Sequence, residues 1–448
     1  MHFKLLLLFL FNLIFSQSYY ESAIGRSFDS YTARSLSLSS SSQVTETSGF
    51  SLFFNPSNLS RGGEMGFSLT GSSIFDSKFE RRGLIVKDSF GDFLAESDYV
   101  KNSSIFNYNS LSMKYNKIIL DYLNAGLAFS FAPYRTFDFS YIEEVRGQLS
   151  SNDGQIFSRD PLLGYHRFSS KGSQYVLGVG SSIGFETNSN IEGAFGFSFN
   201  TILTGDIIES ANVDTSLAIG TIVTEDSNEL SSLPDYKVDY SLGSSDFIVI
   251  GTNIIYKKYL FSLSYQNGTT ISKDISDEDA NILSSIADSY HSNELGKNIL
   301  EYHNSIKISE LEVPEKLSFG FSILDKENNG YNLVLNYELN NYSKNSLLLS
   351  NNRLSLGLEH YTVNGIPLRF SIGHKKSIFS PYITSVTSFS GGSSLKYKKI
   401  TFDYGFQYYH TRYSYPDLFL VEGEFRPDLD IVNDSNILLF STLTYRFN

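Results

Sequence analysis

The sequence of 448 residues contains no cysteine and no tryptophan. Without cysteine the chain can form neither disulfide bonds nor thiolate metal sites. There are only seven histidines, and no His-Glu-x-x-His metalloprotease motif occurs. Lysine and arginine number 35 against 48 acidic residues, and no basic patch emerges that could neutralise nucleic-acid phosphates. We therefore expect neither an enzyme nor a nucleic-acid-binding protein, and no cofactor or metal site.

Long hydrophobic runs are also missing, with one exception at the N-terminus. Leu5–Phe15 is apolar apart from Asn12 and follows a short basic start. It is too short to span a bilayer, and Ser16-Gln17-Ser18 offers small residues for cleavage before Tyr19. We interpret residues 1–18 as a secretory signal peptide, with a retained membrane anchor as the alternative.

The rest of the chain is dominated by short runs in which apolar and polar residues alternate. From about Glu64 onward we count roughly fourteen such runs, each of strand length. Tight turns alternate with long connections between them. The turns are expected at Asn116-Lys117, Thr187–Asn190, Tyr256–Lys258, Glu327–Gly330, Asn364–Ile366 and Lys398-Lys399. This order predicts an all-β fold, a transmembrane antiparallel β-barrel of about 14 strands formed by residues 64–448, in the outer membrane of a Gram-negative-type bacterium.

Alternation assigns one set of side chains to lipid and the other to the lumen. In residues 191–200, Phe195, Phe197 and Phe199 share one face, and the opposite face carries small and polar residues. The 37 Phe and 30 Tyr would supply the two aromatic girdles in the absence of Trp. Tyr445 and Phe447 end the last run, and we interpret them as the signal read by the barrel-assembly machinery. Glycines inside strands, as in Gly178–Gly184, indicate bends or close approach.

Residues 19–63 do not read as barrel strands. They are rich in serine, which is typical of disorder. However, Phe50, Leu52, Phe53 and Phe54 would be costly to leave in water, and Asn55-Pro56 favours a turn. We predict that this segment folds into the lumen as a hatch.

Several motifs resemble the FadL-like superfamily of outer-membrane proteins. Ala33-Arg34 followed by Asn55-Pro56-Ser57-Asn58-Leu59 is similar to the N-terminal region of these proteins, and Ile24–Phe28 resembles a Gly-Arg stretch in the transporters. The superfamily includes long-chain fatty-acid and hydrocarbon transporters and PorV/PorQ-type proteins of type IX secretion. The resemblance implies fourteen strands and an N-terminal hatch in the lumen, with Arg34, Asn55, Pro56 and Leu59 as its candidate hatch residues.

One long connection, residues 268–315, carries apolar residues near helical spacing. They are Ile282, Leu283, Ile286, Tyr290, Leu295 and Ile299. The spacing predicts one or two amphipathic helices. In the resembled transporters, helical outer loops form the groove that first captures the ligand, so these residues are candidates for ligand capture. Packing onto the barrel rim is the alternative. Asp274, Asp277, Glu278 and Asp279 lack the spacing of a calcium site and are interpreted as a solvated acidic loop.

Three functions remain open at this point. The first is passage of a hydrophobic small molecule such as a fatty acid through the outer membrane. The second is a PorV/PorQ-like accessory of protein secretion, with secretion components as partners. The third is a general diffusion porin, which the polar lumen face favours and a hatch would oppose. In each case outer-membrane lipid surrounds the barrel.

Overall fold

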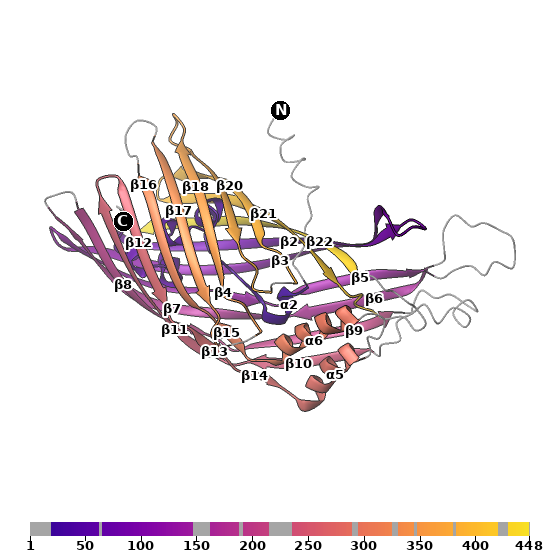
Figure 1. Ribbon diagram of the computed structural model, residues 1–448. Coiled ribbons are helices and arrows are strands. Elements are labelled where there is room, and N and C mark those ends of the chain that lie inside the picture. The colour runs from indigo at the N-terminus through magenta and orange to yellow at the C-terminus, as the bar shows by residue number, and fades with distance from the viewer. Residues whose placement is uncertain are drawn as a thin grey trace, which may run out of the picture.

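The structure is a computed structural model that describes residues 19–61, 65–146, 162–187, 191–214, 235–288, 294–324, 330–344, 347–379, 382–419 and 429–447. Residues 1–18, the expected signal peptide, lie outside the described residues. The wall is a closed antiparallel barrel of 14 strands, as predicted (Figure 1). Each wall strand pairs with the next wall strand along the chain, β4 pairs with β7, and β22 closes the barrel against β2.

The wall strands are β2 (Gly66–Lys87), β3 (Phe93–Leu120), β4 (Leu123–Thr136), β7 (Ser173–Glu186), β8 (Ile191–Ile202), β11 (Ser245–Tyr256), β12 (Tyr259–Gln266), β16 (Glu315–Leu324), β17 (Tyr331–Asn341), β18 (Asn351–Tyr361), β19 (Pro367–Lys375), β20 (Val386–Tyr397), β21 (Ile400–Tyr415) and β22 (Asp430–Phe447).

The tight turns lie at the end of the barrel where β2 begins and β22 finishes. They include Lys257-Lys258 and Lys398-Lys399, as expected. The turn predicted at Asn116-Lys117 was wrong. Strand β3 continues to Leu120, and the chain turns at Asp121-Tyr122. Ile118, Ile119 and Leu120 continue the strand as exposed apolar residues, with a register shift between Ile118 and Leu120.

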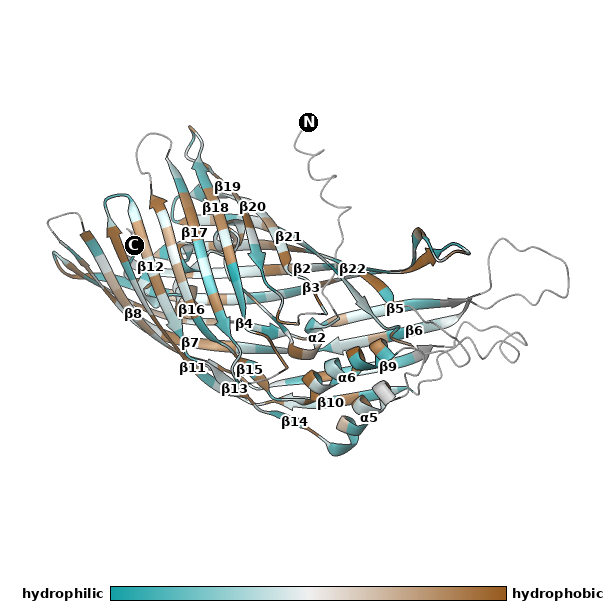
Figure 2. Ribbon diagram, viewed as in Figure 1, coloured by the Kyte–Doolittle hydropathy of each residue, from teal (hydrophilic) through white to brown (hydrophobic). Residues whose placement is uncertain are grey.

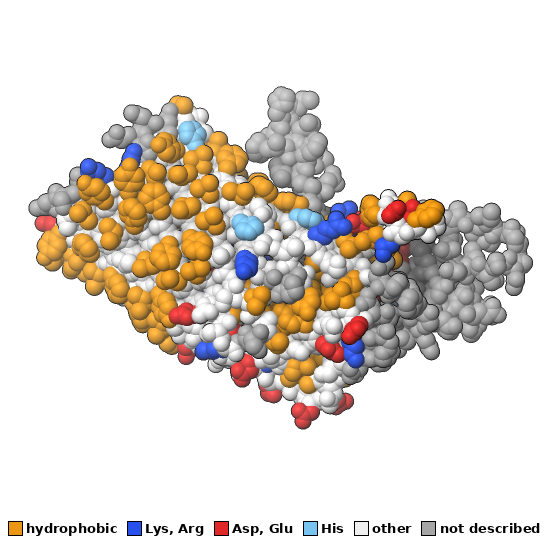
Figure 3. All heavy atoms as spheres, in the orientation of Figure 1, with side chains coloured by type: hydrophobic (Ala, Val, Ile, Leu, Met, Phe, Trp, Pro, Cys, Tyr) orange, Lys and Arg blue, Asp and Glu red, His pale blue; other side chains and the backbone are white. Residues whose placement is uncertain are grey.

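The two faces of the wall differ in polarity as the alternation predicted. In β18, Leu354, Leu356 and Leu358 point outward and are 41–48% exposed, whereas Arg353 and Glu359 point inward and are buried. Figure 3 shows exposed hydrophobic side chains spread over the wall, and Figure 2 shows the alternation along single strands. Exposed tyrosines stand beside the tight turns, namely Tyr122, Tyr256, Tyr331, Tyr397 and Tyr445. A closed wall with an outward apolar band and an aromatic girdle is an outer-membrane barrel.

The described parts of the long connections contain strands and helices, of which the sequence predicted only the helices. Beyond the barrel, β5 (Phe139–Arg146), β6 (Leu162–Lys171), β9 (Gly205–Asp214), β10 (Tyr236–Leu242) and β14 (Lys273–Ile275) form a second antiparallel sheet. β13 (Thr269–Ile271) pairs with β15 (Leu311–Val313). The predicted helices of residues 268–315 are confirmed as α5 (Asp277–Asp288) and α6 (Glu294–Ile308). No helix among the described residues is long and apolar enough to cross a bilayer.

The N-terminal segment is folded inside the barrel. It consists of α2 (Glu21–Ile24), β1 (Arg26–Ser27), α3 (Ala33–Ser37), α4 (Ser42–Thr45), η2 (Gly49–Phe53) and η3 (Pro56–Leu59). The side chains of Thr32 and Ser48 cap the starts of α3 and η2. For example, the Thr32 side chain accepts the N–H of Ser35. The Ser-rich composition therefore supports turns rather than disorder. Below, "hatch" means residues 19–61.

Candidate functional site

The Asn55-Pro56 turn of the hatch is bound directly to the barrel wall. Asn55 Nδ2 donates to Ser262 Oγ at 2.6 Å and to Asn253 Oδ1 at 3.1 Å. Its Oδ1 accepts the backbone N–H of Ser57 at 3.1 Å and thereby starts η3. Asn55 is fully buried, so every one of these polar contacts is made away from bulk water.

Lumen-facing glycines let the hatch approach the wall backbone. A Cβ built on Gly196 would lie 2.3 Å from the backbone of Pro56 and Ser57, and one on Gly251 would lie 1.9 Å from Asn55 Oδ1. Other strands have glycines against the hatch in the same way: Gly126 against Leu59, Gly320 against Val44, Gly357 against Leu38 and Gly405 against Ser37. The expectation that strand glycines mark close approach is confirmed, and the hatch is close-packed against the wall.

Arginines attach the hatch to the wall at two heights. Near the tight-turn end, Arg34 Nη2 lies 2.9 Å from Glu359 Oε2. Toward the long loops, Arg26 Nη1 lies 2.7 Å from Asp76 Oδ2, and its Nη2 donates to Asn436 Oδ1 at 3.3 Å. The Gly25-Arg26 pair singled out in the sequence therefore places a cation where the wall carries a buried acid. Gly25 itself has φ +70°, and a Cβ there would lie 2.7 Å from the Phe137 ring.

A cavity of about 210 Å³ is lined by residues of the hatch, of the wall and of the connection that follows β19. One part of its lining is apolar and aromatic, formed by Tyr31, Phe53, Phe54, Val176, Phe247, Ile378, Phe379, Ile383, Leu438 and Phe440. The other part is charged, formed by Glu21, Arg26, Asp29, Arg135, Lys316, Glu338, Arg353, Lys375, Lys376 and Asp434. The cavity is therefore amphipathic, whereas the sequence indicated a lumen face made mainly of small and polar residues.

Asp29, like Glu21, is a hatch carboxylate that lines this cavity. Its Oδ2 lies 2.8 Å from Arg353 Nη1 and 3.3 Å from Lys375 Nζ. Burial alone would raise the pKa of Asp29, but the cations of Lys375, Arg353 and Lys316 outweigh burial and hold the pKa below its ordinary value. Asp29 is therefore ionised at neutral pH.

A second cavity, of about 330 Å³, lies on the tight-turn side of the hatch. Arg34, Glu46, Lys114, Arg369 and Asp403 contribute charged groups to its lining. The two cavities have no described lining residue in common. The hatch therefore lies between these two cavities.

The helices of the long loop pack onto the rim and onto the start of the hatch. Leu283 and Ile299 are buried, Ile282 and Ile286 are partly buried against the same cluster, and Leu295 is 54% exposed. Tyr290 lies outside the described residues. None of these residues lines the 210 Å³ cavity, so their role in ligand capture stays a prediction.

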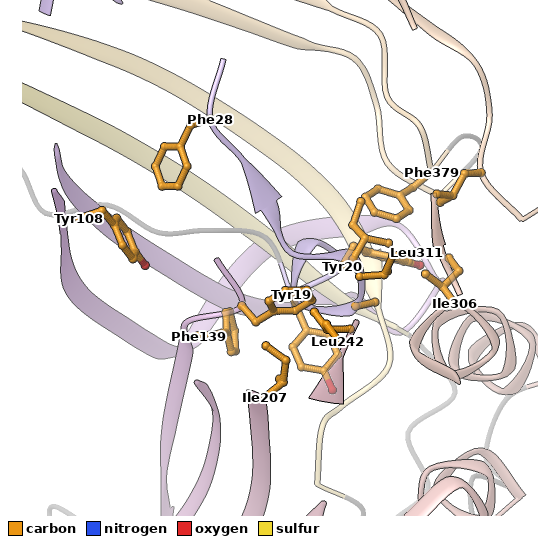
Figure 4. Packing of buried hydrophobic residues seen from close by; sticks show 14 of the residues in the cluster. Tyr19, Tyr20, Phe28, Tyr108, Phe139, Ile207, Leu242, Ile306, Leu311 and Phe379 are labelled. Atoms are coloured by element: carbon orange, nitrogen blue, oxygen red, sulfur yellow. The ribbon is translucent and has the colours of Figure 1, made fainter. Parts of the chain in front are cut away.

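Helix α6 also contacts the first residues of the hatch (Figure 4). The His303 ring lies 4.8 Å from that of Tyr19, and His303 Nδ1 is 2.9 Å from Tyr415 Oη. Lys307 forms a buried ion pair with Glu209 at 2.8 Å and lies over the Tyr19 ring. Through these residues the outer loop holds Tyr19 in place.

The predicted barrel-assembly residues lie at the tight-turn end of β22. Tyr445 is 37% exposed and Phe447 is 45% exposed, with their rings 4.6 Å apart. The Phe447 ring also lies 5.1 Å from that of Phe67 on β2. Both side chains belong to the outward face at the point where the barrel closes, and their recognition by the assembly machinery stays a prediction.

The sequence and the structure were compared with those of known proteins. No protein-family model matches the sequence, and no curated protein matches it. Among solved structures, a FadL homologue from Pseudomonas aeruginosa is similar to this chain with a TM-score of 0.52 and 11% identity, over 95% of this chain and 100% of its own. The fold is that of the FadL-like outer-membrane barrels. A mutant of the TodX monoaromatic hydrocarbon channel gives a TM-score of 0.50 and 13% identity, over 93% of this chain and 99% of its own. The FadL-like fold inferred from sequence motifs is confirmed.

Several residues of the site could not be identified from the sequence. Asp29, Asp76 and Lys375 belong to no motif, and their contacts join positions between 50 and 346 residues apart. One sequence signal could have identified the wall residues among them, namely a charged residue at an inward-facing position of a predicted strand. Such a residue needs a partner in the lumen because an unpaired buried charge is costly.

Proposed function

We propose that the protein passes a hydrophobic small molecule, such as a fatty acid, across the outer membrane. The observation that carries this proposal is the amphipathic cavity above the hatch. Its aromatic lining can remove an acyl or aryl group from water, while its charged lining can orient a polar head group. The fold neighbours, described as a FadL homologue and a monoaromatic hydrocarbon channel, support the same class of ligand.

The close packing of the hatch argues against a general diffusion porin. Porins keep a water-filled lumen. Here the hatch contacts the wall at glycine positions on several strands, and the two cavities on its sides have no described lining residue in common. We therefore infer that passage is selective and involves a shift of the hatch.

Uptake by cells that carry or lack the protein tests this proposal. Isotope-labelled long-chain fatty acid is supplied at a concentration that limits uptake. We expect the protein to increase uptake, and Ile378→Asp to abolish the increase because it places a carboxylate in the apolar lining of the cavity. Val363→Asp is the matched control, since Val363 is 86% exposed in the turn after β18.

The outcomes separate the candidate functions. Equal uptake with and without the protein would refute transport of this ligand class. Large steady conductance of the purified barrel in planar bilayers would favour a porin. Co-purification with secretion components, without any lipid-like ligand, would favour a PorV/PorQ-like accessory.

A further inference from the structure

Two cations of the barrel wall converge on one point of the cavity. Arg353 on β18 and Lys375 on β19 are direct partners in the register of these strands. Both bind the same oxygen, Oδ2 of Asp29, at 2.8 Å and 3.3 Å. A guanidinium and an ammonium on adjacent strands form a preorganised site for one carboxylate, because the sheet fixes their separation.

The carboxylate that fills this site belongs to the hatch. Asp29 lies between β1 and α3, and its backbone carbonyl accepts the hydroxyl of Ser42 at 3.2 Å. The side chain of Asp29 is 27% exposed and that of Lys375 is 39% exposed, although Arg353 is only 5% exposed. The site is therefore closed on the wall side and accessible from the cavity.

The charge of the cavity favours an anionic occupant. Its described lining contains six basic and four acidic side chains, although the whole chain has a formal charge of −13. The apolar lining formed by residues such as Phe54, Phe247 and Ile378 belongs to the same cavity. A ligand that satisfies both parts has an apolar body and one negatively charged end.

We propose that Arg353 and Lys375 bind the carboxylate head group of an amphiphilic ligand, and that this head group displaces Asp29. The inference rests on the proposed function, because it names the head-group site of the same cavity. Asp29 is then an internal competitor. A small carboxylate without an apolar body gains too little to replace it, whereas an amphiphile adds the burial of its chain.

Displacement also connects ligand binding to the hatch. Once Asp29 is released, residues 28–32 lose their ion pair with the wall. Arg353 Nη2 still donates to the carbonyl of Ser39 at 2.9 Å, so the hatch stays attached further along the chain. The head group thereby loosens one segment of the hatch and leaves the rest in place.

A pair of ligands with equal chains and different head groups tests the inference. Dodecanoate and dodecanol are titrated at pH 8 into the full-length protein in lipid nanodiscs, and bound ligand is measured by native mass spectrometry. We expect Asp29→Asn to bind dodecanoate about tenfold more tightly, the effect of one charge-assisted hydrogen bond, and dodecanol unchanged. In the Asp29→Asn background, Lys375→Gln should reverse the gain.

Asp239→Asn is the matched control, because Asp239 is exposed on β10 and pairs only with exposed Lys237 among the described ion pairs. Equal affinity of wild type and Asp29→Asn for dodecanoate, with both ligands bound, would overturn the inference and leave the proposed function standing. Tighter binding of dodecanol as well as dodecanoate would also overturn it, because the gain would not depend on the head group. If wild type and variants bind neither ligand, the proposed function fails and the inference fails with it.

Discussion

Arg34 of the hatch and Glu359 of β18 form a two-point ion pair. Arg34 Nη2 lies 2.9 Å from Oε2, and Arg34 Nε lies 3.3 Å from Oε1. Glu359 is fully buried and also accepts from Arg369 at 2.8 Å and from Asn332 at 2.8 Å. One wall carboxylate thus holds a wall arginine and the hatch together.

Neutralising this carboxylate should loosen the hatch at its tight-turn end. We expect Glu359→Gln to lower the free energy of unfolding by about 3 kcal/mol, because it removes the buried anion of Arg34 and leaves Arg369 with Asp403 alone. Denaturant unfolding of the barrel in liposomes measures this. Glu301→Gln, which breaks an exposed pair with Lys297 on α6, should change the value by less than about 0.5 kcal/mol. Equal effects of the two variants would contradict the role given to Glu359.

A methyl group on the wall should also disturb the hatch. Gly196→Ala places a Cβ against the backbone of Pro56 and Ser57, which cannot rotate away as a side chain could. We expect a loss of about 1–3 kcal/mol in stability and larger current fluctuations in planar bilayers. Gly71→Ala is the control, since a Cβ on Gly71 has no neighbour within 4 Å. Identical behaviour of the two variants would show that the hatch is not held at Gly196.

The absence of native cysteine makes a covalent test possible. Ser39 Oγ of the hatch lies 3.5 Å from Ser388 Oγ on β20, so Ser39→Cys with Ser388→Cys should form a disulfide after a small adjustment. We expect oxidation to stop uptake and a reductant to restore it. Thr70→Cys with Thr444→Cys, where the two hydroxyls of the wall are 3.2 Å apart, should form a bond without blocking uptake. Normal uptake through the fully oxidised Ser39–Ser388 variant would show that passage needs no movement of this part of the hatch.

Acid should loosen α6 from the start of the hatch. Burial and the nearby charge of Lys307 hold the pKa of His303 well below its ordinary value of 6.5. When α6 opens, His303 binds a proton with a pKa near 6.5, whereas the packed state stays neutral. The stability of the packed state is therefore complete above about pH 6.5 and falls below it, by at most about 1.4 kcal/mol per pH unit.

Hydrogen–deuterium exchange of Glu294–Ile308 at pH 7.5 and pH 5.5, corrected for the intrinsic rate, measures this effect. His303→Gln should remove the pH dependence, because glutamine can still bond Tyr415 but does not titrate. If the variant keeps the same pH dependence, another group is responsible.

Local patterns were sufficient to predict the wall. Strands such as β8 and β18 show strict alternation because one face meets lipid and the other meets the hatch. The two loop helices were likewise visible, since Leu283 with Ile286 and Leu295 with Ile299 recur at helical spacing. The Asn55-Pro56 turn was identifiable because its chemistry is local.

The second sheet and the ionic contacts required tertiary information. Phe139 and Tyr141 alternate as in a wall strand and are buried, yet they belong to β5 outside the barrel. Alternation alone does not distinguish these two sheets. The partners of Asp29 and Arg34 lie more than 300 residues away in the sequence, so only the closed barrel brings them together.

The glycine contacts have a consequence for the order of biogenesis. The hatch is the first part of the described chain, but the strands that receive it, from β4 to β21, are distributed over the rest. Asn55 cannot form its hydrogen bonds with the wall before β11 and β12 have formed, and Ser37 cannot pack against the wall before β20 and β21 have formed. The hatch precedes these strands in the chain but can pack only after they have formed, so it must stay unaggregated until the final strands are present.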